Sequence, residues 1–92
     1  MTEVAAAHIT PNQMWAARLL LGWSRERLAG YADTTGSFVY TYETESRVMT
    51  MFSRERYFDG LAAIRIVLEA AGVEFVDENG GGAGVRLRKT AT

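Results

Sequence analysis

The stretch TPNQMWAARLLLGWSRERLAGYADTTGSFVYTY, residues 10–42, contains the start and stop signals of three successive helices. Thr10 and Gln13 have the spacing of a capping box, and a proline occupies the first helical position between them. This pattern predicts a helix from Pro11 to about Leu21. At helical spacing, the residues expected to face the core are Met14, Ala17, Leu20 and Leu21.

Two shorter helices are expected next. Ser24 is placed to cap a second helix that runs from Arg25 to about Ala32, and Thr35 is placed to cap a third that runs to about Tyr42. The residues expected to face the core are Leu28, Ala29 and Ala32 in the second helix and Phe38, Val39 and Tyr42 in the third. Helix, turn and helix in this order predict a helix-turn-helix.

A longer helix and a β-hairpin are expected in the second half of the chain. Residues 44–52 show no clear periodicity and are predicted to form a loop or a single turn. Ser53 is placed to cap a helix that runs to about Ala71. The expected core stripe of this helix is Tyr57, Leu61, Ile64, Leu68 and Ala71. Residues 73–76 and 85–88 partly alternate like short strands around a glycine-rich turn, which predicts a hairpin.

The predicted fold class is therefore mainly α, a four- to five-helix bundle with a helix-turn-helix core followed by a short C-terminal β-hairpin. The expected organisation is a flexible N-terminal tail at 1–9, a helical domain at 10–72, and the hairpin with a C-terminal tail at 73–92. An isolated two-stranded hairpin is only marginally stable in water. This hairpin is therefore expected to pack on the helices or to pair with a second copy, which would give a homodimer.

The composition of the chain argues against several classes of function. The 92 residues carry a net charge of −1, and 48% of them are hydrophobic, as in an ordinary globular domain. There is no cysteine and the single histidine is His8, so neither a disulfide nor a zinc site is expected. No acid–base pair indicates catalysis, and no apolar run approaches the ~20 residues of a membrane span. The expectation is a cytoplasmic protein that is not an enzyme, with no catalytic residue, cofactor, metal or membrane association.

The order of these elements and several short segments resemble the Xre family of bacterial regulators, the Cro and phage-repressor-like helix-turn-helix proteins. The matching segments are ITPNQMWAAR at 9–18, LLGWS at 20–24, LA at 28–29, TGSFVYTYE at 35–43, AAIR at 62–65, LEAAGVEF at 68–75 and ENGGG at 78–82. The resemblance covers most of residues 9–89. It implies a DNA-binding repressor or activator, usually a dimer, whose third helix enters the major groove.

The predicted third helix departs from what this resemblance implies. From Leu28 to Ser46 the chain contains no lysine, arginine, asparagine or glutamine, which are the side chains that best read base edges. The residues expected on the exposed face of the third helix are Gly36, Ser37, Tyr40 and Thr41. Apolar side chains are instead predicted outside the core at Trp15 and Leu19 on the first helix and at Ile66 on the fourth.

These departures suggest a helix-turn-helix that has become a protein-binding module. The chain is similar in this respect to the QseM-like antiactivators, which resemble Xre regulators and silence quorum-sensing transcriptional activators by binding them. The predicted partner-binding residues are Trp15, Leu19, Gly36, Ser37, Phe38, Tyr40 and Thr41. Three of them have a structural alternative: Phe38 and Tyr40 would complete the core, and Trp15 would cover the tail or the hairpin.

The alternative function is that of a sequence-specific DNA-binding Xre-family repressor. In that case Ser37, Tyr40 and Thr41 would contact bases with little discrimination. The arginines expected to contact the DNA backbone are Arg25, Arg27, Arg47 and Arg54, with Arg56 beside them. A continuous basic surface over the third helix would favour this alternative, and a neutral face with exposed Trp15 would favour protein binding.

Overall fold

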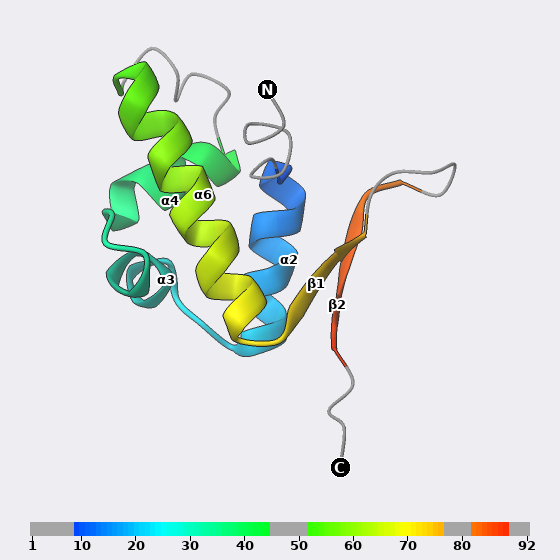
Figure 1. Ribbon diagram of the computed structural model, residues 1–92. Coiled ribbons are helices and arrows are strands. Elements are labelled where there is room, and N and C mark those ends of the chain that lie inside the picture. The colour runs from blue at the N-terminus through cyan, green and yellow to red at the C-terminus, as the bar shows by residue number, and fades with distance from the viewer. Residues whose placement is uncertain (1–8, 45–51, 77–81, 89–92) are drawn as a thin grey trace.

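The computed structural model describes residues 9–44, 52–76 and 82–88, and these form four helices and a two-stranded hairpin (Figure 1). The elements are α2 (Pro11–Leu21), α3 (Arg25–Tyr31), α4 (Gly36–Thr44), α6 (Arg54–Ala70), β1 (Val73–Val76) and β2 (Gly84–Leu87). This architecture confirms the predicted fold class. Of the predicted tail at 1–9, Ile9 is buried in the core and residues 1–8 lie outside the described residues. Most of the predicted loop at 44–52, with Arg47 in it, also lies outside them.

The helices begin where the sequence predicts them. The Thr10 hydroxyl accepts from the Gln13 amide while the Gln13 side chain accepts from the Thr10 amide, so the capping box is complete. The Ser24 and Ser53 hydroxyls accept from the backbone amides three residues later and so cap α3 and α6. The Thr35 hydroxyl accepts in the same way from the amide of the third residue of α4. The predicted end of α2 coincides with the observed one, and the other three differ by one or two residues, which is within the fraying of helix termini.

The buried core joins all four helices and the hairpin. Its apolar members are Ile9, Met14, Ala17, Leu28, Ala29, Ala32, Phe38, Val39, Tyr42, Leu61, Ile64, Leu68 and Val73. The second and third helices face the core as predicted. In α6 the central residues of the predicted stripe are buried, whereas Tyr57 is partly exposed and Ala71 lies in the exposed turn that follows the helix.

The orientation of α2 about its own axis differs from the prediction at one core position. Leu20, predicted to face the core, is 43% exposed, while Gln13 and Arg18 are buried. Both polar side chains make hydrogen bonds to other elements: Gln13 to the hairpin, and Arg18 to α4 and to the loop after α2. These two residues form the borders of the buried face of α2, and Leu20 falls outside that face.

The hairpin packs on the helices, as one of the two predicted arrangements requires. Its strands are antiparallel, with Val73 opposite Leu87 and Phe75 opposite Val85. Val73 is fully buried. The side-chain amide of Gln13 donates to the carbonyl oxygens of Val76 on β1 and Gly84 on β2, at 3.2 and 3.0 Å. Among the described residues no helix is both long and apolar enough to cross a bilayer.

Candidate functional site

The candidate site is the α2–α4 surface, which we define by the exposed side chains of Trp15 and Leu19 on α2 and of Ser37 and Tyr40 on α4. Trp15 is 43% exposed, Leu19 66% and Tyr40 49%. These values confirm that the three predicted contact residues are accessible to a partner. Gly36, also predicted here, is partly buried beside the Glu26 side chain at the start of α4.

A buried ion-pair network holds α4 against α2 beneath this surface. The Glu43 carboxylate of α4 accepts two hydrogen bonds from the Arg18 guanidinium of α2, both at 2.8 Å. It accepts a third from Nε of Arg25, the first residue of α3, at 2.9 Å. Arg18 also donates to the carbonyl oxygen of Trp23 at 3.0 Å. The paired fork geometry fixes the relative positions of three helices and satisfies a carboxylate that has no exposure to solvent.

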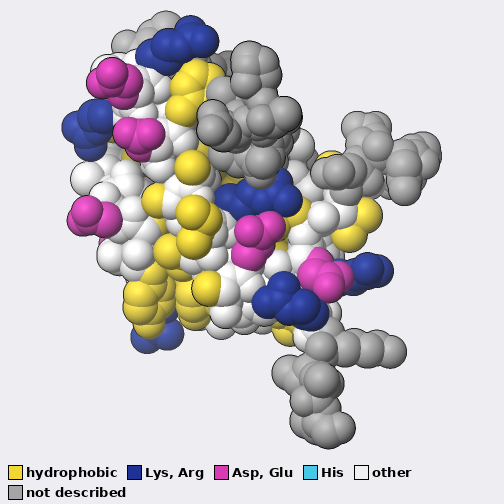
Figure 2. Space-filling view, in the orientation of Figure 1, with side chains coloured by type: hydrophobic (Ala, Val, Ile, Leu, Met, Phe, Trp, Pro, Cys, Tyr) yellow, Lys and Arg dark blue, Asp and Glu magenta, His cyan; other side chains and the backbone are white. Residues whose placement is uncertain are grey.

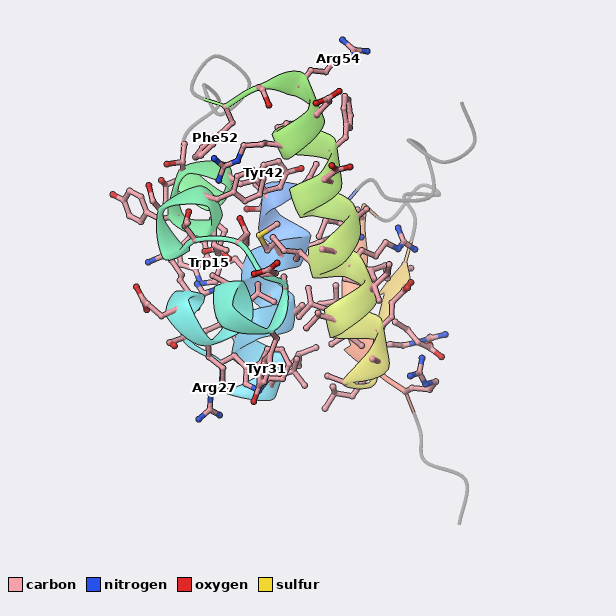
Figure 3. The ribbon with its side chains drawn as sticks, turned by 60° about the vertical axis from the view of Figure 1, so that its left-hand side comes forward. Trp15, Arg27, Tyr31, Tyr42, Phe52 and Arg54 are labelled. Atoms are coloured by element: carbon pink, nitrogen blue, oxygen red, sulfur yellow. The ribbon has the colours of Figure 1, made fainter. Side chains whose placement is uncertain are left out.

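The two aromatic members of the α2–α4 surface each lie close, along their own helix, to the ion pair that joins α2 and α4. Trp15 precedes Arg18 by three residues, and Tyr40 precedes Glu43 by three, so each lies about one helical turn from a member of the ion pair. Figure 3 shows the Trp15 side chain on the side of α2 that faces α3 and α4. Each exposed ring therefore lies about one helical turn from the ion pair that joins the two helices.

The same network removes cationic charge from the exposed face of α4. Arg18 is buried against Glu43. Arg25, a predicted DNA-backbone contact, bonds the same carboxylate while its guanidinium lies 5.0 Å from the centre of the Tyr40 ring. Arg25 is thus engaged with protein groups on both sides, and a phosphate would have to compete with a buried carboxylate for it.

Two predicted partner-binding residues belong to the interior instead. Phe38 is 1% exposed, and its ring packs edge-on against Phe52 with 5.1 Å between centroids. Thr41 is 4% exposed. The prediction that Phe38 and Thr41 belong to the binding surface is wrong. Most side chains of α4 are buried, and only a narrow strip that includes Ser37 and Tyr40 faces solvent. Phe38 meets α6 at Gly60, where even a methyl group would come within 3.0 Å of the ring, so the core alternative holds for Phe38.

The remaining arginines of the DNA alternative are dispersed. Arg27 and Arg54 are exposed, and Figure 3 places them at opposite ends of the molecule. Arg54 lies 5.4 Å from the Phe58 ring centre, and Arg56 lies 5.5 Å from that of Phe52. Arg47 lies outside the described residues. The arginines that the structure describes do not form one continuous basic stripe along α4.

A second apolar surface follows α6, where hydrophobic side chains form a stripe in the space-filling view (Figure 2). Ile66, predicted to be exposed, is 65% exposed. At the end of this stripe Trp23 and Tyr31 pack together, with 4.9 Å between ring centroids, and line a shallow groove with the C-terminal turn of α6. The Trp23–Tyr31 pair was not predicted, because the two residues belong to different segments and neither has a distinctive spacing.

One tyrosine beneath the surface is perturbed by its surroundings. Tyr42 donates its hydroxyl to the carbonyl oxygen of Ile9 and lies beside Tyr57, with 6.2 Å between ring centroids. Burial, and secondarily the neighbouring Tyr57, raise the pKa of Tyr42 well above its ordinary value. This hydrogen bond ties the residue before α2 to α4, so it is structural and does not belong to a site.

The most important residues that the sequence did not reveal are Arg18 and Glu43. Nothing in their spacing, 25 residues apart, distinguishes a buried pair from two solvated charges. Among the described residues, no three histidine, cysteine, aspartate or glutamate side chains group closely enough to hold a metal ion. No family model and no curated protein matches the chain. The resemblance to Xre regulators therefore stays a prediction from the sequence.

Proposed function

We propose that this protein is a cytoplasmic transcriptional regulator whose degenerate helix-turn-helix binds and inhibits a protein partner, such as a transcriptional activator of the quorum-sensing type. The regulatory role rests on the resemblance to Xre proteins. The choice of a protein partner rests on the α2–α4 surface. The observation that carries the proposal is that Tyr40 on α4 and the apolar Trp15 and Leu19 on α2 are all exposed, while Arg25, which lies against the Tyr40 ring, is held by Glu43.

The chemistry of this surface supports a protein partner in two ways. Tryptophan and tyrosine are the residues most enriched among the side chains that dominate binding energy at protein interfaces. Both rings are held on helices that the buried ion pair fixes, so little conformational entropy would be lost when a partner covers them. A complementary partner surface would contain an apolar groove that accepts Trp15 and Leu19, with a polar rim near the Tyr40 hydroxyl.

The proposal is tested by capture of activator proteins with the tagged full-length chain and three single variants. Trp15→Ala and Tyr40→Ala should each reduce capture of the activator at least tenfold, the effect of losing about 1.4 kcal/mol or more. Ile66→Ala is the matched control, because Ile66 is an even more exposed apolar side chain but lies on α6, and it should leave capture unchanged. In a reporter strain, the wild-type chain should lower transcription from the promoter that this activator controls, and the two surface variants should not.

Two outcomes would contradict the proposal. One is that capture is insensitive to both surface variants while their thermal unfolding matches that of the wild type. The other is that Ile66→Ala abolishes capture, which would move the interface to α6. The competing function is sequence-specific DNA binding. Among the described residues it is favoured by the exposed Arg27 and Arg54, which Figure 3 places at opposite ends of the molecule and not together beside α4.

A further inference from the structure

The buried ion-pair network beneath the α2–α4 surface contains one more positive charge than negative charge. Glu43 supplies one carboxylate to two guanidinium groups, those of Arg18 and Arg25. Every nitrogen of the Arg18 guanidinium is engaged, Nε and Nη2 with Glu43 and Nη1 with the carbonyl oxygen of Trp23. Arg18 therefore neutralises the carboxylate, and the charge of Arg25 has no counter-charge within the network.

Arg25 brings this extra charge to the surface. Its side chain is 29% exposed, although the Glu43 carboxylate that its Nε bonds has no exposure. Among the described residues none accepts a hydrogen bond from Nη1 or Nη2 of Arg25, and these two atoms form the pair of donors that a carboxylate matches. The guanidinium lies 5.0 Å from the centre of the Tyr40 ring, so it borders the α2–α4 surface.

The acidic side chain nearest in sequence does not neutralise Arg25. Glu26 is exposed and lies against the start of α4, where its Oε2 is 3.2 Å from the position that a Cβ at Gly36 would occupy. In the described part of the chain, Glu43 is the only carboxylate that forms an ion pair with Arg25. Since Glu43 holds Nε and the Tyr40 ring lies against the guanidinium, the two remaining donors are already oriented for a ligand.

We propose that the partner bound at the α2–α4 surface places a carboxylate, from an aspartate or glutamate side chain, on Nη1 and Nη2 of Arg25. The inference rests on the proposed function, because it names the chemistry that the partner brings to that surface. A partner that covers Tyr40 also covers the guanidinium that lies against its ring. Apolar cover would remove water from both donors and bury an unmatched charge, whereas a carboxylate satisfies the donors and brings the network to zero net charge.

The surroundings of Arg25 favour a protein carboxylate over a duplex phosphate, the other oxyanion that paired donors bind. A duplex presents a row of phosphates, and affinity for it grows with the number of cations that neutralise that row. The arginines that the structure describes form no continuous stripe along α4, and Glu26 places an exposed negative charge directly after Arg25. One cation with an acidic neighbour therefore matches a single carboxylate better than a row of phosphates.

A double-mutant cycle between Arg25 and the acidic residues of the captured activator tests this inference by titration calorimetry. Arg25→Gln should weaken binding of the activator about tenfold or more, and so should the change of one aspartate or glutamate of the activator to its amide. Either change made in the presence of the other should have almost no further effect. Arg27→Gln is the matched control, because it removes an exposed arginine of the same helix, and it should alter the affinity by less than about twofold.

The outcomes separate this inference from the proposed function. If Arg25→Gln weakens binding by the same factor for every activator variant, Arg25 acts only through the fold, and the inference is overturned. The proposed function would still stand if Trp15→Ala and Tyr40→Ala reduce capture. If capture is insensitive to all three substitutions, both fail.

Two further measurements keep the test decisive. If Arg25→Gln abolishes sequence-selective binding to upstream DNA, the ligand is a phosphate, which also overturns the inference. If Arg25→Gln does not fold, as judged by circular dichroism, Arg25→Lys replaces it in the cycle. Lysine keeps the charge but has one nitrogen to share between Glu43 and the activator, so the same coupling to one activator carboxylate is expected. The absence of any such coupling would overturn the inference.

Discussion

At the scale of single residues, the features that matter most are polar side chains that hold elements together. Glu43 accepts bonds from two arginines, and Gln13 completes a helix cap while bridging both strands of the hairpin. Capping could be predicted from the sequence because it depends on residues three positions apart. The Arg18–Glu43 pair could not, because it joins helices whose relative rotation is set by the packing of the whole core.

Substitution of Glu43 should therefore be severe. Glu43→Gln leaves the Arg18 guanidinium buried without its carboxylate, and breaking a buried pair in this way costs about 3–5 kcal/mol. Urea unfolding followed by circular dichroism measures the loss. The control is Glu74→Gln, which breaks the exposed pair with Arg86 and should cost less than about 1 kcal/mol. Equal effects of the two variants would show that the buried network is not what fixes α4.

Tyr42 should make stability depend on alkaline pH. Its pKa is raised in the folded state from an ordinary value of 10.0, so the folded protein favours the neutral hydroxyl. The stability that this preference provides is complete below pH 10.0 and is lost progressively as the pH rises above that value. Thermal unfolding of Tyr42→Phe should show a shallower decline than the wild type in this range. Parallel declines would contradict the burial of the Tyr42 hydroxyl, which is the main cause of its raised pKa.

At the scale of elements, the starts of the helices were predicted well and the faces they bury were predicted less well. Leu20 was assigned to the core, which is wrong, and Phe38 was predicted both as a core residue and as a partner contact, of which only the first is correct. Helical periodicity gives the angular spacing of apolar residues but not which of two adjacent stripes meets a neighbour. Two contacts between elements decide which stripe is buried. The absence of a side chain at Gly60 makes room for the Phe38 ring. On α2, Gln13 bonds to the hairpin and Arg18 bonds to α4, which sets the rotation of that helix.

The junction between α2 and the hairpin supplies a test at this scale. Gln13→Ala removes one half of the capping box and both hydrogen bonds to the strands. We expect the loss of about 1–3 kcal/mol of stability and faster amide exchange across β1 and β2 than across α3 and α4. Asn12→Ala, a change at the exposed neighbouring position, should affect neither measurement. Uniformly faster exchange throughout the chain would show that Gln13 does not act on the hairpin in particular.

At the scale of the whole molecule, two exposed apolar surfaces lie over different elements. The α2–α4 surface is proposed for an activator, and the stripe on α6 has no occupant assigned to it. The sequence indicated the first surface through Trp15 and Tyr40.

The proposal that the helix-turn-helix meets a protein and not a duplex is tested most directly by titrating the purified chain onto its own upstream DNA. Fluorescence anisotropy at ~50 and ~200 mM salt, with a scrambled duplex of the same length, reports both sequence selectivity and the number of phosphates neutralised. The account predicts weak binding that is the same for the two duplexes. Tight binding to the upstream sequence alone, falling steeply between the two salt concentrations and lost in Tyr40→Ala, would contradict it.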